Sequence, residues 1–136
     1  MSTSSARQAQ LPIWRDANRL LLEIEQAVRR FPRYHKYALG TDLRRQAMAV
    51  CRCIVRAAAA QGDARERLLE RLVLTVEDLK LSIQLAKELQ AFASFAEFAR
   101  AAELAVAVGK QSGGWRKSAR ARARPEVLPD ASLAGG

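Results

Sequence analysis

A chain of 136 residues, of which 49% are apolar, is long enough to bury one hydrophobic core, so the sequence predicts a single domain. Its longest apolar runs are far shorter than the roughly 20 residues that cross a bilayer, which argues against a membrane-spanning protein. The formal net charge of +9 favours a polyanionic partner, because a surface of one sign repels itself.

The first predicted helix covers residues 12–30. Pro12 suits the first helical turn, and apolar side chains follow at helical spacing: Trp14, Leu20 or Leu21, Ile24 and Val28. Phe31-Pro32 ends the helix, because the residue before a proline is pushed out of the helical region. We expect the small, polar residues 1–10 to be disordered.

The second predicted helix covers residues 34–61, with one apolar stripe formed by Leu43, Ala47, Val50, Cys51, Ile54 and Ala58. At Gly40-Thr41 the helix either runs through or kinks. Gly62 suits a left-handed closing residue. Asp63, with Glu66 three residues later, has the spacing of a capping box for the next helix.

The third predicted helix covers residues 64–91, with Leu68, Leu72, Val76, Leu79, Ile83 and Ala86 at spacings of three and four. The fourth begins at Ser94, where Glu97 completes a second capping box, and its buried face comprises Phe95, Phe98, Ala102, Ala105 and Val108 or Gly109. Gly113-Gly114 should weaken this helix. Beyond Lys117 the chain has little left to pack.

Three short connections place each helix antiparallel to the one before. The sequence therefore predicts an all-α, up-down-up-down four-helix bundle over residues 11–117, between disordered tails at residues 1–10 and 118–136. A bundle helix needs only about three apolar positions in seven. The second and fourth helices exceed this, which suggests a homo-oligomer with partner subunits on the surplus residues: Met48, Val50, Val55, 57–60, Leu104, Val106 and Val108.

Groups suited to catalysis or metal binding are few. His35 has no acid between residues 26 and 41 to orient it. Cys51 and Cys53 lie about 200° apart around a helix, so they cannot chelate one metal, and core packing is the default for Cys51. We expect no enzyme, no metal and no cofactor. Without the apolar segment of a secretion signal, the cysteines indicate reduced thiols and a cytoplasmic protein.

Basic residues are concentrated in the turn at residues 29–36 and in two stretches without acids, 43–62 and 104–125. On a helix, Arg45, Arg52 and Arg56 lie within about 20° of one line, where their planar guanidinium groups can bind successive phosphates. The alternative is that the arginines pair with acids of neighbouring helices. The candidate nucleic-acid contacts are Arg29, Arg30, Arg33, Lys36, Arg44, Arg45, Arg52, Arg56, Lys110, Arg116, Lys117 and Arg120.

The segment from Trp115 to Arg124 has two interpretations. As a flexible basic arm it would add affinity for nucleic acid without sequence specificity, and otherwise it is a solubilising end. Trp115 either stacks on a base or, as is commoner for a Trp beside Gly-Gly, closes a core or an interface.

Two motifs resemble a known family. One is Phe-Pro-Arg-Tyr-His-Lys-Tyr-Ala-Leu-Gly at residues 31–40, followed by Leu43-Arg44, and the other is Gly-Lys-Gln-Ser-Gly-Gly-Trp at residues 109–115, followed by Lys117. Both are similar to the four-helix-bundle family of 23S ribosomal RNA intervening-sequence proteins and of the accessory variability determinant proteins of diversity-generating retroelements. The resemblance covers roughly residues 12–117.

This resemblance implies an antiparallel four-helix protomer in a ring-like homopentamer. For the retroelement branch it implies a non-catalytic protein that binds RNA or DNA together with a reverse transcriptase, and supports mutagenic cDNA synthesis. The basic turn and the second-helix arginines would belong to its charged surface, whereas the Arg/Ala tail has no family role. The alternative is the intervening-sequence branch, acting as a protein-interaction scaffold whose basic face docks an acidic protein.

Overall fold

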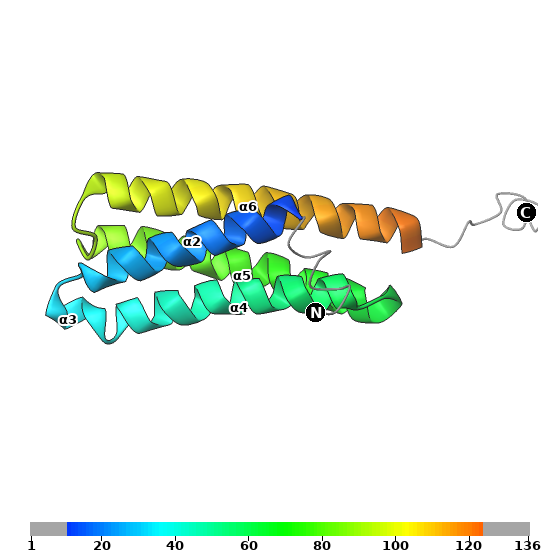
Figure 1. Ribbon diagram of the computed structural model, residues 1–136, viewed down its shortest axis with the longest axis horizontal. Helices are drawn as coiled ribbons and strands as arrows, with labels where there is room; N and C mark the ends of the chain where they lie inside the picture. Colours follow the sequence, from blue (N-terminus) through cyan, green and yellow to red (C-terminus); the bar gives the residue numbers. More distant parts are fainter. Residues whose placement is uncertain (1–10, 124–136) are drawn as a thin grey trace, which may run out of the picture.

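Four long helices form a single bundle, and each runs antiparallel to the long helix before it in the chain (Figure 1). In the computed structural model, which describes residues 11–123, the helices are α2 (Pro12–Arg29), α4 (Leu39–Ala59), α5 (Gly62–Glu88) and α6 (Phe95–Ala123). The one-turn helix α3 (Arg33–Lys36) lies in the α2–α4 connection. Because α2 and α5 each pack against both α4 and α6, the latter two occupy diagonal corners. The predicted antiparallel four-helix bundle is confirmed.

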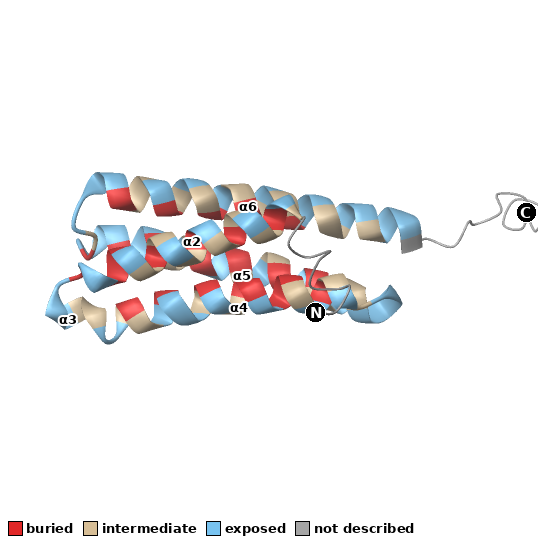
Figure 2. Ribbon diagram, viewed as in Figure 1, coloured by how far each residue is buried: buried red, intermediate tan, exposed pale blue. Residues whose placement is uncertain are grey.

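The core is a line of apolar residues from each helix, repeating at three and four and facing inward (Figure 2). Burying each large aliphatic side chain contributes about 1.5–3 kcal/mol. The α6 line is mostly alanine, which lets this helix approach its neighbours closely. The fully buried residues include Leu20, Ile24, Leu43, Ile54, Leu72, Val76, Leu79, Ile83, Ala101, Ala105 and Val108.

Two predictions about apolar side chains are wrong. Phe95, assigned to the buried face of the fourth helix, is 70% exposed. Val50 and Val108, assigned both to the buried stripes and to the surplus residues for a partner subunit, are buried in the core, so their second assignment is wrong, whereas Met48 and Val106 are exposed as predicted. Periodicity fails for Phe95 because a residue in the first turn of a helix lies at the end of the bundle, where the neighbouring helices leave it exposed.

The break in the second predicted helix lies at residues 37–38, between α3 and α4, so Gly40-Thr41 is inside α4. A Cβ atom on Gly40 would lie 2.6 Å from Cγ1 of Val28 on α2. This distance is below van der Waals contact, and Val28 is itself buried. Gly40 is therefore the residue that permits α4 to pack closely on α2.

The α4–α5 turn contains Gly62 with a φ of +59°, which confirms the predicted left-handed residue. Asp63 does not cap α5, because the helix already begins at Gly62 and its start has no side-chain cap. Instead Arg65 donates hydrogen bonds to the carbonyl oxygens of Ala57 and Ala58, at 3.0 and 3.2 Å. The last turn of α4 is thus closed by an arginine of the following helix.

Helix α6 continues through Gly113-Gly114 and past Lys117 to Ala123, so the predicted weak point does not end it. Side chains C-terminal to the glycines hold the helix in place. Trp115 packs against the core, and the Nε atom of Arg120 lies 2.7 Å from Oε1 of Glu66 on α5. The prediction that residues 118–123 begin a disordered tail is wrong, because they are helical and Ala119 packs against the core. The rest of the predicted disorder, at residues 1–10 and 124–136, lies outside the described residues.

The α5–α6 turn offers a test of backbone strain. Gln90 has a φ of +57°, and the N–H of Ala91 donates to the carbonyl oxygen of Ala86 at 2.9 Å, as in a helix-closing motif that favours glycine. Because the left-handed region costs an L-residue roughly 1 kcal/mol, we expect Gln90→Gly to raise the free energy of unfolding in urea by about 0.5–1 kcal/mol. Gln84→Gly, inside α5, should lower it by about 1 kcal/mol, and equal losses at both positions would contradict the strain.

Candidate nucleic-acid interface

Arg45, Arg52 and Arg56 form one line along the exposed face of α4, opposite the buried Leu43 and Ile54. This set is called the α4 arginine line below. At the helical rise it spans about 16 Å. None of the three takes part in an ion pair within residues 11–123. The three guanidinium groups can therefore bind phosphates without first breaking an internal pair.

The other predicted arginine of α4 is held differently. Arg44 lies one residue away from the α4 arginine line and points toward α2, where its Nε atom is 2.7 Å from Oε2 of Glu25. Arg29 approaches Oε1 of the same carboxylate at 3.8 Å. Arg44 therefore follows the alternative interpretation, in which an arginine pairs with an acid of a neighbouring helix, whereas Arg29 pairs with an acid of its own helix.

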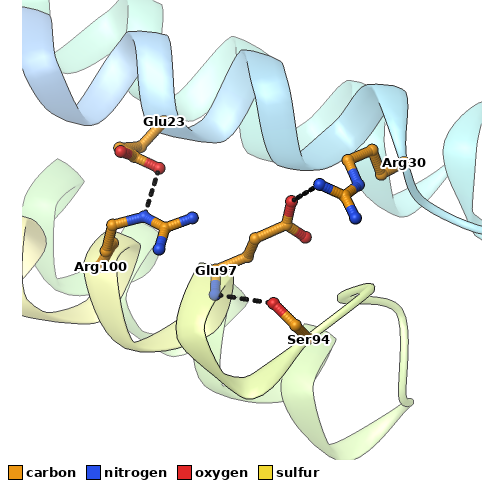
Figure 3. A network of polar contacts seen from close by, with 5 residues as sticks. All are labelled: Glu23, Arg30, Ser94, Glu97 and Arg100. Atoms are coloured by element: carbon orange, nitrogen blue, oxygen red, sulfur yellow. Dashed lines mark hydrogen bonds and ion pairs between the residues drawn. The ribbon is translucent and has the colours of Figure 1, made fainter.

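Arg30 contacts a buried carboxylate (Figure 3). Its Nη1 atom lies 3.1 Å from Oε1 of Glu97, which is 6% exposed. Ser94 Oγ accepts a hydrogen bond from the N–H of Glu97 at 3.2 Å, so half of the predicted capping box is present. The carboxylate does not return to Ser94. It reaches across to α2, where removal of Arg30 would leave a buried charge unpaired.

In the C-terminal half of α6, Arg116 and Arg120 share one acid of α5. Their Nε atoms lie 3.8 and 2.7 Å from Oε1 of Glu66. Lys110 and Lys117 have exposed side chains and join no ion pair in the described part of the chain. Glu66, predicted to cap α5, thus ties α5 to α6.

The predicted basic groups do not form one surface. Arg33 and Lys36, on α3, lie with residues 29–30 at one end of the bundle, whereas the α6 group lies toward the opposite end (Figure 1). The α4 arginine line and the α6 group also occupy diagonal corners. Among the predicted basic groups of residues 11–123, the α4 arginine line places three exposed guanidinium groups on one helix face with no acid paired to them.

A shallow groove of ≈ 190 Å³ lies beside the α4 arginine line, and is lined by Trp14, Cys51, Arg52, Val55 and Arg56. Cys51 contacts α2 through its Sγ atom, which lies 3.7 Å from the carbonyl oxygen of Ala17. The sequence pattern places Trp14 in the core, but it is only partly buried. No local signal could reveal its place beside Arg52, because only the antiparallel packing of α2 on α4 brings the two together.

Burial raises the pKa of the Cys51 thiol from 9.0 to about 11, with a smaller opposing effect from the positive charge of Arg52. The thiol is therefore neutral at pH 7, and little nucleophilic thiolate is available. In a Cys53→Ala background we expect iodoacetamide to alkylate Cys51 far more slowly than a free thiol at pH 8, with a rate that rises up to about pH 11. A rate that levels off near pH 9, the unshifted thiol pKa, would contradict the shift.

The remaining polar groups that could support chemistry are dispersed. His35 lies on α3 with its ring edge-on to that of Tyr34, at a centroid distance of 5.0 Å. Among residues 11–123 no three His, Cys, Asp or Glu side chains gather closely enough to hold a metal ion. None of the helices described combines the length and the apolar composition needed to cross a membrane.

Comparison with known protein families finds no family that matches this chain, and comparison with curated proteins finds no significant relative. Several motif residues have structural roles in the bundle itself. Gly40 permits close packing on α2, and the ring of Phe31 packs edge-on against Phe92 at a centroid distance of 5.3 Å.

Proposed function

We propose that this protein binds polynucleotides through the α4 arginine line and does not itself catalyse a reaction. The observation that carries the proposal is the row formed by Arg45, Arg52 and Arg56, which a rigid helix presents to solvent and which pairs with no acid of the described chain. Guanidinium forks bind phosphate oxygens in two-point fashion. The net charge of +9 adds long-range attraction for any phosphate chain.

The finer proposal concerns the biological setting. On the resemblance of residues 31–44 and 109–117, we propose an accessory protein of a diversity-generating retroelement in the cytoplasm. It would bind the reverse transcriptase together with template RNA or cDNA, and support mutagenic cDNA synthesis. The basic turn at residues 29–36 would extend the charged surface in the assembled complex, since Arg33 and Lys36 pair with no acid in the described chain.

Self-association is supported by a row of leucines on the outer face of α5. Leu74, Leu81 and Leu85 are 60%, 57% and 48% exposed and lie within about 20° of one line. Exposed apolar rows of this kind mark protein contacts. We propose that α5 contacts another subunit, in the homopentamer that the motif resemblance implies, and that the assembly repeats the α4 arginine line around its axis.

A second candidate is a protein-interaction scaffold of the intervening-sequence type. The same α5 leucine row favours it, because leucine side chains offer a protein partner apolar area but offer no donor to phosphate. In this alternative the basic face would dock an acidic protein, and polynucleotide would bind poorly at physiological salt.

Affinity purification of the full chain from its host cells, with and without nuclease, separates the two. We expect template RNA and the reverse transcriptase to be recovered together, and the RNA to be lost when the α4 arginine line is changed to glutamine. Recovery of a stoichiometric protein partner after complete digestion, with no nucleic acid in the undigested sample, would instead favour the scaffold.

A further inference from the structure

Each of the two tryptophans lines a shallow groove, and the grooves differ in charge. The Trp14 groove is lined by Trp14, Cys51, Arg52, Val55 and Arg56, a set that contains two guanidinium groups and no carboxylate. The Trp115 groove is lined by Gly62, Arg65, Glu66, Trp115, Ala119 and Arg122. It therefore holds a carboxylate, and this carboxylate already binds Arg116 and Arg120.

We infer that the Trp14 groove takes one unpaired base of a single-stranded polynucleotide, stacked on the indole, while Arg52 and Arg56 bind the phosphates that flank it. The inference rests on the proposed polynucleotide binding and specifies its substrate as single-stranded. Nucleobases stack on aromatic side chains whatever their sequence, because every base has a π-face. The groove therefore supplies affinity without sequence preference.

The lining of the groove is suited to an uncharged ring between two anionic groups. Trp14 and Val55 are apolar, and burial keeps the Cys51 thiol protonated at neutral pH, so the wall carries no negative charge that would repel phosphate. The two guanidinium groups stand one helical turn apart on the same wall. A hydrophobic peptide or lipid chain would fill the apolar part but would leave both cations without a partner.

A base-paired duplex fits the groove poorly. Its bases are stacked inside the helix, and a base reaches a side pocket only when it is flipped out, at a cost of a few kcal/mol. Arg45, about 10 Å further along α4, can still bind the phosphates of either form. Duplex binding should therefore depend on the α4 arginine line alone, and single-strand binding on the line together with Trp14.

Fluorescence of the native indole tests this directly. In the full chain carrying Trp115→Phe, Trp14 is the one remaining tryptophan, because the sequence holds two. We expect single-stranded RNA and DNA of about 16 nucleotides to quench its emission on binding. Inorganic polyphosphate and the annealed duplex should bind the arginines without quenching. Binding of the single strands with unchanged emission would overturn the inference.

Substitution provides a second measurement. Trp14→Leu keeps apolar volume but removes the stacking surface, so we expect single-strand affinity to fall roughly five- to 150-fold, with duplex affinity nearly unchanged. The matched control Trp115→Leu should retain the single-strand affinity.

Two outcomes separate the base pocket from the polynucleotide proposal. If Trp14→Leu binds single strands as tightly as the native protein while the arginine substitutions weaken that binding, the base pocket is wrong and the polynucleotide proposal stands. If the native protein binds no polynucleotide, both the base pocket and the proposed polynucleotide binding are wrong. Should Trp14→Leu not fold, the fluorescence result decides.

Discussion

Replacing Arg45, Arg52 and Arg56 together by glutamine lowers the affinity for single-stranded polynucleotide roughly 100-fold at about 50 mM salt. Each lost charge-assisted contact costs about 1 kcal/mol, less than a buried contact of this kind because all three side chains are exposed, so the three together cost about 3 kcal/mol. Glutamine retains helix propensity and length, so the helical content should not change. Fluorescence anisotropy of a labelled oligonucleotide measures the affinity, and circular dichroism measures the fold.

The matched control for this variant removes the same number of positive charges elsewhere. Arg29, Arg44 and Arg120 are exposed but paired with Glu25 or Glu66. Changing all three to glutamine should lower the affinity for polynucleotide only a few-fold, because their charges are already partly neutralised by the paired acids. The fold should survive the change, because exposed ion pairs add little stability. If both triple variants lose the same affinity, net charge alone explains binding and the α4 arginine line has no special role.

Gly40→Ala should destabilise the bundle by about 1–3 kcal/mol, although the same change at an open helix position is stabilising. The new Cβ would lie 2.6 Å from Cγ1 of Val28, a buried and β-branched residue with few alternative rotamers. Accommodation therefore requires α2 and α4 to move apart. Urea unfolding followed by circular dichroism measures the change.

Gly109→Ala on α6 is the matched control for Gly40→Ala. Its Cβ would meet Cγ1 of Val76 at 3.5 Å, which is ordinary contact, and the residue is helical. We expect a gain of about 0.5–1 kcal/mol from helix propensity. A stabilised Gly40→Ala variant would show that the α2–α4 contact is not as close as described.

The fold could be predicted because its signals are local and repeated. Buried residues of α5 such as Leu72, Leu79 and Ile83 recur at helical spacing, and Pro32 and Gly62 mark where helices stop. Details of the turns could not be predicted in this way. The motif at Ser94 and Glu97 has the spacing of a capping box, but the carboxylate binds Arg30 instead, and that partner is 67 residues away along the chain.

The candidate interface could likewise be predicted from sequence only in part. The alignment of Arg45, Arg52 and Arg56 follows from sequence spacing, because all three lie within one helix. Which basic residues pair with acids depends on contacts between helices, so sequence could not separate Arg44 from its neighbour Arg45. The place of Trp14 beside Arg52 likewise depends on the packing of α2 against α4.

The salt dependence of single-strand affinity tests most directly the central claim, that the α4 arginine line binds phosphates. Each phosphate contact contributes about 0.7 to the slope of log affinity against log salt for a single strand. With one contact each from Arg45, Arg52 and Arg56, the glutamine variant should have a slope shallower than the native protein by about 2. Equal slopes for the two proteins, or no measurable binding by the native chain at low salt, would contradict the account.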